Sequence, residues 1–364
     1  MLEQITRHPS VPSQRHLVSS DRSFLLRPHE YERLSEIHAA LDRALQGLHR
    51  YVTGHDQYGY AGAAQRIRSR MVGPLPLLEY AGRMPTFVTT EFVLDVHRQP
   101  HLVSVNAHSA RHWDAIVAVS RDASSALSAS RLIQAIAGRF KGWDLVHIEE
   151  APHARAPQLM RALMDQGVRI RSRTLDEAMR QSSKEWQCMF DLPLSAGRAQ
   201  IREQIYRRSS FTIEPCVHLS HQSMLTLLCE TERDVAVSDI VRNRIIDAET
   251  LAQLQSCVAK TYSIASTSLP TNAVMKSALP MSVQRCLSRS DVNEQMRNTE
   301  LLEAYVAQER IEPLHVSIPS AHEPCPVRLI CVSYRGELLT GMAVARIPSN
   351  GQPARDVPLE LGTR

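Results

Sequence analysis

Apolar residues recur at three- and four-residue steps between Pro28 and Tyr51. The apolar positions are Tyr31, Leu34, Ile37, Leu41, Leu45 and Leu48. This spacing is the period of an amphipathic helix, and it predicts a long helix that packs one face onto a core. Residues 52–75 predict a glycine-containing connection followed by a second, weaker helix.

Two β-hairpins are predicted further along the chain. The runs Thr86–Asp95 and Pro100–Asn106 are rich in β-branched and aromatic residues and are separated by the polar sequence V-H-R-Q, which is typical of a hairpin. The runs Pro326–Tyr334 and Leu338–Arg346 flank a Tyr-Arg-Gly turn and predict the second hairpin.

Helices and strands alternate between these hairpins. The segments Trp143–Glu149, Ala156–Gln166 and Val168–Arg173 predict a strand, a helix ending at Gly167 and a second strand. This order is typical of a β-α-β unit in a parallel sheet. The other expected helices are Ala110–Val119, Ser124–Phe140, Ile201–Ile205, Leu219–Cys229, Val241–Tyr262 and one ending at Glu300–Tyr305, and the other expected strands are Trp186–Phe190, Ala273–Lys276 and Val306–Glu309. The fold class is therefore α/β or α+β, with at least two lobes.

Composition narrows the class of protein. The 364 residues correspond to about two domains, and 43% hydrophobic with 22% charged residues is the balance of a globular protein. A net charge of +4 is too small to argue for nucleic-acid binding. We expect a cytoplasmic protein without a membrane segment, because neither an 18-residue apolar run nor a secretory signal is present.

Several common enzyme motifs are missing. The sequence contains no G-x-x-x-x-G-K-[ST], no G-x-G-x-x-G and no G-x-S-x-G, which argues against a P-loop NTPase, a Rossmann dehydrogenase and an α/β-hydrolase. The seven cysteines form no C-x-x-C pair, so neither a zinc ribbon nor a disulfide framework is supported. Only four of the 42 basic residues are lysines, and an ammonium group can fill roles that a planar guanidinium cannot.

Six segments, in this order, resemble a known family. They are E-F-V-L-D-V-H-R-Q-P-H-L-V-S-V-N-A (91–107), D-L-V-H-I-E-E-A-P-H (144–153), I-Y-R-R (205–208), T-N-A-V-M-K-S-A (271–278), Y-V-A-Q-E-R-I-E-P (305–313) and R-L-I-C-V-S-Y-R-G-E-L-L-T-G-M-A-V-A-R-I (328–347). Together they are similar to the circularly permuted ATP-grasp proteins, relatives of glutathionylspermidine synthase, over about residues 20–350.

The resemblance implies a fold and a division into domains. Two antiparallel-sheet lobes would clasp a nucleotide beside a parallel β-α-β domain. The expected division is a flexible lead-in (1–20), N-terminal helices with a permuted hairpin (21–120), the β-α-β domain (121–235), a nucleotide-binding lobe (236–350) and a tail (351–364).

The resemblance also implies an activity, which is ATP-dependent ligation of a small carboxylic acid to an amine through an acylphosphate. Charge develops on phosphate oxygens in such a reaction, so Mg²⁺ and cationic side chains are needed. Mg²⁺ takes oxygen ligands. ATP and Mg²⁺ are thus the expected cofactors, and the acid and the amine are the expected partners.

The implied site residues come from four segments. Glu91 and Asn106 match the metal-binding positions of the first hairpin, and Lys276 matches the lysine that reaches the ATP phosphates. Gln308 and Glu309 match an edge strand that meets the adenine. A phosphate-facing arginine at the terminal hairpin corresponds to Arg346, and the resemblance makes Lys276 and Arg346 the catalytic pair.

Each of these residues also has an ordinary interpretation. Lys276 and Arg346 could be solvated cations, and Glu91 a solvated strand carboxylate. Asn106 could be a turn residue that caps the helix at 110. The pair at 308 and 309 could belong to an interdomain salt bridge.

The chain departs from the family pattern at three places. Ser104 stands where the family has a bridging glutamate, and Ser223 where relatives carry a second lysine. Residues 277–284 (S-A-L-P-M-S-V-Q) lack the glycines that let backbone amides cover phosphates. Asp95 and Asp114 are candidates to compensate for Ser104. These departures keep two alternatives open: a degenerate ATP-grasp protein that acts as a binding or scaffolding partner, and an unrelated α/β transferase.

Other polar residues suggest weaker sites. His108 and His112 would share one face of a helix, and His153 would follow a strand. The run Tyr206–Arg208 is a basic patch that could meet an anionic substrate, and His322, Glu323 and Cys325 lie in a polar loop. The oligomeric state is open.

Overall fold

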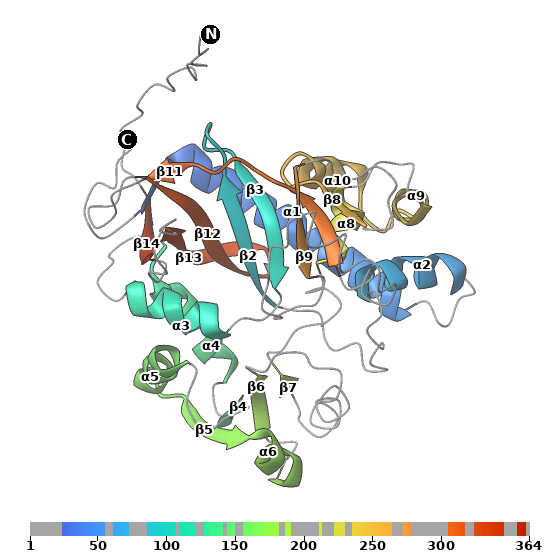
Figure 1. The fold of residues 1–364 in the computed structure, drawn as a ribbon. Coiled ribbons are helices and arrows are strands. Elements are labelled where there is room, and N and C mark those ends of the chain that lie inside the picture. Colours follow the sequence, from blue (N-terminus) through green and yellow to red (C-terminus); the bar gives the residue numbers. More distant parts are fainter. Residues whose placement is uncertain are drawn as a thin grey trace, which may run out of the picture.

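The protein is a mixed α/β molecule in a computed structural model (Figure 1). The structure describes residues 24–54, 61–72, 86–106, 110–120, 127–140, 144–149, 156–181, 186–190, 211–212, 222–229, 235–263, 272–277, 305–316, 324–345 and 355–361. The described strands form one seven-stranded sheet, one three-stranded sheet and one four-stranded sheet.

The seven-stranded sheet is built from both ends of the chain. Its strands are β1 (Phe24–Leu26), β2 (Phe87–Leu94), β3 (Pro100–Asn106), β11 (His315–Val316), β12 (Cys325–Tyr334), β13 (Glu337–Ala345) and β14 (Arg355–Leu361). The order is β1-β14-β13-β12-β2-β3, with β11 beside β12. The β1–β14 pair is parallel and the other pairs are antiparallel. Both predicted hairpins are confirmed as adjacent strand pairs of this sheet.

Helices pack on both faces of this sheet. Helix α1 (Pro28–Gly54) packs on one face, where Leu41 shares a buried cluster with Phe92 of β2. Helices α3 (Ala110–Val119) and α4 (Ala129–Arg139) pack on the other face, where Trp113 shares a buried cluster with Ile330 of β12. Successive residues of a strand point to opposite faces, so the strands are apolar on both sides.

The three-stranded antiparallel sheet lies beside the edge strand β3. Its strands are β8 (Thr261–Ser263), β9 (Ala273–Ser277) and β10 (Tyr305–Glu309), in the order β8-β10-β9. The segment that leads into β8 pairs with β3, because the amide of Leu102 donates to the carbonyl of Cys257 at 2.8 Å and the amide of Ala259 donates to the carbonyl of Leu102 at 2.9 Å. These backbone bonds fix the position of the small sheet against the large one.

The four-stranded parallel sheet forms a separate layer in Figure 1. Its strands are β4 (Asp144–Glu149), β5 (Arg169–Thr174), β6 (Trp186–Phe190) and β7 (Phe211–Thr212), in the order β5-β4-β6-β7, and its helices include α5 (Pro157–Asp165) and α6 (Leu175–Gln181). Gly167 follows α5 with a φ of +80°, the left-handed conformation that glycine adopts at helix ends. The predicted β-α-β unit is confirmed.

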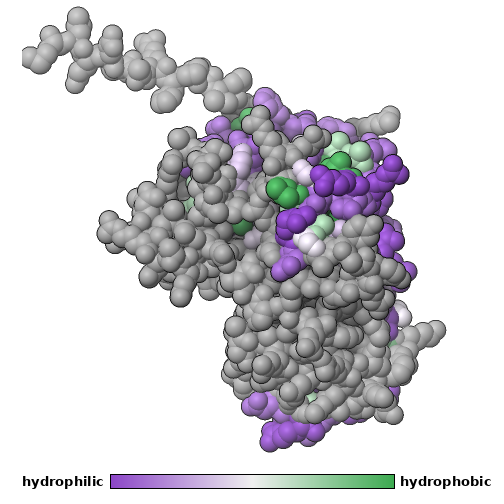
Figure 2. Space-filling view, turned by 90° about the vertical axis from the view of Figure 1, so that its right-hand side faces the viewer, coloured by the Kyte–Doolittle hydropathy of each residue, from purple (hydrophilic) through white to green (hydrophobic). Residues whose placement is uncertain are grey.

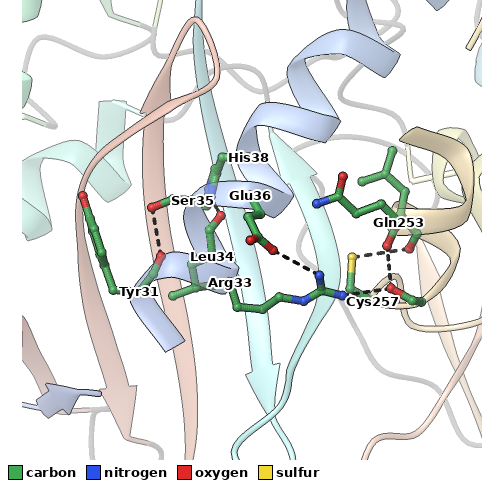
Figure 3. A network of polar contacts seen from close by, with 10 residues as sticks. Tyr31, Arg33, Leu34, Ser35, Glu36, His38, Gln253 and Cys257 are labelled. Atoms are coloured by element: carbon green, nitrogen blue, oxygen red, sulfur yellow. Dashed lines mark hydrogen bonds and ion pairs between the residues drawn. The ribbon is translucent and has the colours of Figure 1, made fainter. Parts of the chain in front are cut away.

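Polar contacts join the helices on this side of the molecule to one another. The guanidinium of Arg33 reaches Glu36 on α1 and donates to Ser256 Oγ, just beyond α10 (Ala248–Gln255), at 2.9 Å (Figure 3). Arg66 of α2 (Ala61–Val72) pairs with the buried Asp239 of α9 (Val235–Arg242) at 2.8 Å. The remaining described helix is α8 (Met224–Cys229).

One predicted helix was wrong. The segment Val241–Tyr262 is not continuous, because Arg244 has a φ of +51° and the chain turns there after α9. Asp247 then caps a new helix, α10, by accepting a hydrogen bond from the amide of Thr250 at 2.8 Å. The end of the segment is not helical either, since Thr261 begins β8.

Smaller corrections concern element ends. The helix expected at Ser124–Phe140 is described from Ala129, and Tyr305 begins β10 rather than ending a helix. Residues 355–361 of the expected tail form β14. The lead-in (1–20) and the helix expected at Ile201–Ile205 lie outside the described residues.

The described surface is mainly hydrophilic on the face shown in Figure 2, with a few apolar side chains among the polar ones. Val235 and Val241 of α9 are exposed apolar residues. Among the helices that the structure describes, none combines the length and the hydropathy needed to span a bilayer.

Candidate functional site

The small sheet turns three polar side chains toward β3. Gln308 on β10 lies directly opposite Thr261 on β8, and Lys276 on β9 lies opposite Val306. Since residues two apart on a strand share a face, Thr261, Gln308 and Lys276 lie on the same side of this sheet. All three are buried.

Two of these side chains donate to one backbone carbonyl of β3, and the third contacts one of the two. Lys276 Nζ donates to Val103 O at 3.3 Å, and Gln308 Nε2 donates to the same oxygen at 3.2 Å. Lys276 Nζ also donates to Gln308 Oε1. Gln308 Nε2 further donates to Thr261 Oγ1 at 3.0 Å. The contact thus binds the two antiparallel sheets together through polar groups.

A β-bulge presents the Val103 carbonyl. Glu91 pairs with Ser104 but the next residue, Phe92, pairs with Leu102, so Val103 is an extra residue on β3. Bulges often occur next to functional sites because they redirect side chains and backbone groups. Here the bulge lies opposite Glu91, one of the predicted site residues.

A second set of polar residues lies on the face of the large sheet that α3 covers. Glu91 pairs with Ser104 and Thr89 pairs with Asn106, so these four residues share one face. Trp113 of α3 identifies the face, because its Nε1 donates to Thr89 Oγ1 at 2.9 Å. Glu91 and Asn106 therefore lie on neighbouring strands and on the same face of the sheet.

Ser104 accepts two hydrogen bonds at the centre of this set. Asn106 Nδ2 donates to Ser104 Oγ at 3.3 Å, and Gln222 Nε2, from the residues that precede α8, donates to it at 2.9 Å. The three side chains are buried. Glu91 is less enclosed, and its Oε2 lies 3.9 Å from Nη1 of Arg328.

The residues present fit one Mg²⁺ ion but offer few ligands. A hydroxyl oxygen has two acceptor lone pairs, and both lone pairs of Ser104 are taken by amide donors. Among the described residues of this set, Glu91 and Asn106 are left as the side chains whose oxygens would hold such an ion. Mg²⁺ is commonly held by one or two carboxylates together with substrate phosphates, so one carboxylate and one amide oxygen suffice for one ion.

The two aspartates considered as replacements for Ser104 have other roles. Asp95 Oδ1 accepts from the amides of His97 and Gln99, and Oδ2 lies 3.0 Å from Nε2 of His101. Burial raises the pKa of Asp95, but these bonds outweigh it and the pKa lies below its ordinary value. Asp95 therefore stabilises the β2–β3 turn.

Asp114 holds the start of α5. Its Oδ1 accepts from the amides of Gln158 and Leu159 at 2.7 and 2.8 Å. Burial raises the pKa of Asp114, and the two amides offset only part of this rise. Its carboxylate is thus committed to a helix N-terminus rather than to Ser104.

The remaining predicted site residues have different outcomes. β10 is the central strand of its sheet rather than an edge strand. Glu309 follows Gln308, so its side chain points to the opposite face. Ser223 is buried beside Gln222. Arg346 lies outside the described residues.

The weaker candidate sites gain little from the structure. Among the described residues, no three His, Cys, Asp or Glu side chains come together in a way that could hold a metal ion. His112 lies on α3, and Cys325 is buried in β12. The other residues of these candidates, at 108, 153, 206–208 and 322–323, lie outside the described part of the chain.

Two residues of the site escape prediction from the sequence. Gln222 contacts Ser104, which stands at the position of the family's glutamate, and Thr261 contacts the predicted residue Gln308. Neither Gln222 nor Thr261 belongs to one of the six segments. Only the tertiary structure brings them to the site. The proximity of Gln222 to Ser223, which the resemblance singled out, was the nearest available indication.

Comparison with known proteins bears on the fold. No protein-family model matches the chain, and no curated protein matches it. Among solved structures, a glutathione synthetase-like effector from Globodera pallida, in its apo form, matches with a TM-score of 0.57 over 94% of this chain and 89% of its own, at 10% identity. The overall fold is shared. The mixed α/β architecture, with one mainly antiparallel sheet, one antiparallel sheet and a small parallel sheet, is consistent with an ATP-grasp-like fold.

Proposed function

We propose that this protein is an ATP-dependent carboxylate–amine ligase that uses Mg²⁺. The observation that supports it is the polar region between two antiparallel sheets, where Lys276 and Gln308 of the small sheet meet the edge strand that carries Asn106. Glu91 lies on the next strand, on the same face. The likeness to a glutathione synthetase-like effector agrees with this type of chemistry.

In this proposal each residue has a role that follows from its charge. ATP would supply the phosphoryl group that activates a carboxylic acid before the amine attacks it. Lys276 and Arg346 would neutralise phosphate oxygens. Glu91 and Asn106 would hold Mg²⁺, and the side chain of Gln308 would contact the nucleotide, whereas that of Glu309 faces away from it.

The proposal extends to the domains. Segments 21–120 and 236–350 would supply the nucleotide-binding lobes, and 121–235 the parallel β-α-β domain. The circular permutation belongs to the same proposal. Small-molecule acids and amines, rather than nucleic acids or membranes, would be its partners in the cytoplasm.

A second candidate function is supported by Ser104. Its hydroxyl is uncharged and both of its lone pairs accept from amides, so the site has one carboxylate fewer than the family pattern. A protein that binds nucleotide without ligase activity, and acts as a binding or scaffolding partner, would have such a site.

Nucleotide binding can be tested by thermal unfolding with and without ATP and Mg²⁺. Ligand at 100 times its dissociation constant stabilises a fold by about 2.7 kcal/mol, so we expect a clear rise in Tm. Lys276→Met keeps an unbranched side chain that is one atom shorter but removes the charge, and we expect it to abolish the rise measured against its own ligand-free Tm. Lys260→Met, at an exposed lysine, is the matched control and should keep the rise. Absence of any shift at millimolar ATP would overturn the proposal.

Ligase activity separates the two candidate functions. Hydroxylamine converts an acylphosphate into a hydroxamate, so pooled small carboxylic acids with ATP, Mg²⁺ and hydroxylamine should yield hydroxamates and ADP that mass spectrometry detects. We expect both products with the native protein and neither with Lys276→Met. Nucleotide binding without either product would favour the binding protein over the ligase.

A further inference from the structure

Two hydrogen bonds link Gln222, Ser104 and Asn106 and fix their side chains at the proposed metal site. Gln222 Nε2 and Asn106 Nδ2 both donate to Ser104 Oγ. Ser104 and Gln222 are each only 1% exposed. Asn106 uses its amide nitrogen in this bond, which orients the amide oxygen away from Ser104. The position of the Asn106 amide oxygen, a proposed metal ligand, thus depends on Gln222, which comes from a different part of the chain.

The strands around these three neutral residues offer little negative charge to balance a bound cation. Strands β2 and β3 contain a single acidic residue, Glu91, and it lies on the face shared with Asn106. Two divalent ions about 4 Å apart, the spacing of two-metal sites, repel each other with four times the energy of two unit charges. Nucleotide phosphates offset part of that repulsion, but a second ion also needs ligands from the protein. Beyond Glu91 and Asn106, β2 and β3 offer no further carboxylate, and both lone pairs of Ser104 are taken.

Gln222 has a second polar atom that needs a partner. Its Oε1 is buried and has no hydrogen-bond partner among the described residues. Buried acceptors in native proteins are nearly always satisfied. Mg²⁺ keeps several of its waters when it binds with phosphates, and each such water is a hydrogen-bond donor.

From this geometry we infer that the site takes a single divalent cation with the nucleotide, and that Gln222 is its positioning residue. Gln222 holds Asn106 through Ser104 and accepts a hydrogen bond from a water on the cation at Oε1. The inference rests on the proposed nucleotide site. It assigns a role to Gln222 that neither the sequence motifs nor the resemblance contains.

The test counts cations directly. Mn²⁺ replaces Mg²⁺, and its free concentration is followed by electron paramagnetic resonance during titration of the full chain with the β,γ-imido analogue of ATP, and the Mn²⁺ that the free analogue binds without protein is subtracted. We expect one Mn²⁺ per chain, bound only with the analogue. Two ions per chain would overturn the inference while leaving the nucleotide site intact. Binding of the analogue without Mn²⁺, seen by equilibrium dialysis, would also overturn it.

Substitution of Gln222 tests the positioning role. Loss of a residue that orients a metal ligand typically weakens metal affinity 10- to 100-fold, so Gln222→Met should weaken Mn²⁺ binding by this factor and leave one site per chain. Gln255→Met, at an exposed glutamine at the end of α10, should bind Mn²⁺ like the native protein. Native Mn²⁺ affinity in Gln222→Met would contradict the role. If the native protein binds no analogue at all, the proposed function fails first, and that result is distinct from a wrong count.

Discussion

His38 shows how burial controls the chemistry of a single residue in this fold. Its Nδ1 lies 2.6 Å from Leu34 O and its Nε2 lies 2.8 Å from Thr90 Oγ1, within the contact between α1 and the large sheet. A carbonyl only accepts, so Nδ1 carries the proton and Nε2 accepts from the threonine hydroxyl. Burial lowers the pKa of His38 to about 4, against 6.5 ordinarily.

This shift predicts a loss of stability in mild acid. The unfolded chain takes up a proton below pH 6.5 and the folded chain only near pH 4, so acidification favours unfolding across that window. Between pH 7.5 and pH 5 the His38 contribution amounts to about 2 kcal/mol. In urea unfolding, the native protein should lose unfolding free energy between pH 7.5 and pH 5. In His38→Gln this loss should be smaller by that amount. His97→Gln, at an exposed histidine, should keep the native difference, and an unchanged difference in His38→Gln would contradict the prediction.

The candidate site could be predicted residue by residue only in part. Glu91 and Asn106 share a face because strand alternation and hairpin pairing follow from the local pattern. In the sequence, Asp95 and Asp114 were equal candidates to replace the missing glutamate at 104. In the structure, the carboxylate of Asp95 accepts from the amide of His97, and that of Asp114 accepts from an amide at the start of α5. Hydrogen-bond partners of this kind depend on segments far apart in the chain, so periodicity carries no information about them.

Helix α1 was predicted from its apolar period. One glycine in it shows how tightly this helix packs against its neighbours. Gly47 lies within this 27-residue helix. A Cβ added there would lie 2.1 Å from the carbonyl oxygen of Ile245, in the turn between α9 and α10. The backbone of that turn therefore rests against the helix where no side chain intervenes.

Substitution of this glycine should destabilise the protein despite the better helix propensity of alanine. The helix gains roughly 1 kcal/mol from alanine, but the clash is with backbone, and overpacking typically costs about 1–3 kcal/mol. We expect Gly47→Ala to lower the urea midpoint. Gly138→Ala in α4 is the matched control, since nothing lies within 4 Å of its added Cβ, and it should be neutral or stabilising. A Gly47→Ala protein as stable as the native one would show that the turn at Ile245 moves freely.

At the scale of the whole molecule, the two ends of the described chain complete one sheet. β1 pairs in parallel with β14, and β14 pairs with β13. Phe24 and Leu26 of β1 are buried in the core that α1 covers. The composition of the C-terminal segment predicted a tail, because the segment is polar and contains prolines and glycines. Pairing with β13 and β1 is what makes it a strand.

A chain ending at residue 354 should therefore be markedly less stable. It would expose the edge of β13 and leave β1 without its pairing partner, and exposed edges promote aggregation. We expect a lower Tm and aggregates in size-exclusion chromatography. A synthetic peptide of residues 355–361 should restore part of the Tm, and a scrambled peptide should not. A native Tm in the shortened chain would refute the structural role of β14.

The sequence by itself determined the local elements: helix α1, both hairpins and the β-α-β unit. Each rests on a hydrophobic period or a turn that operates over a few residues. Only the tertiary structure decided how the small sheet contacts β3 at Val103 and which strands lie at the edge of the large sheet. It also decided which side chains donate hydrogen bonds to Ser104. These contacts join residues more than a hundred positions apart, and no local pattern encodes which distant group fills a given buried space.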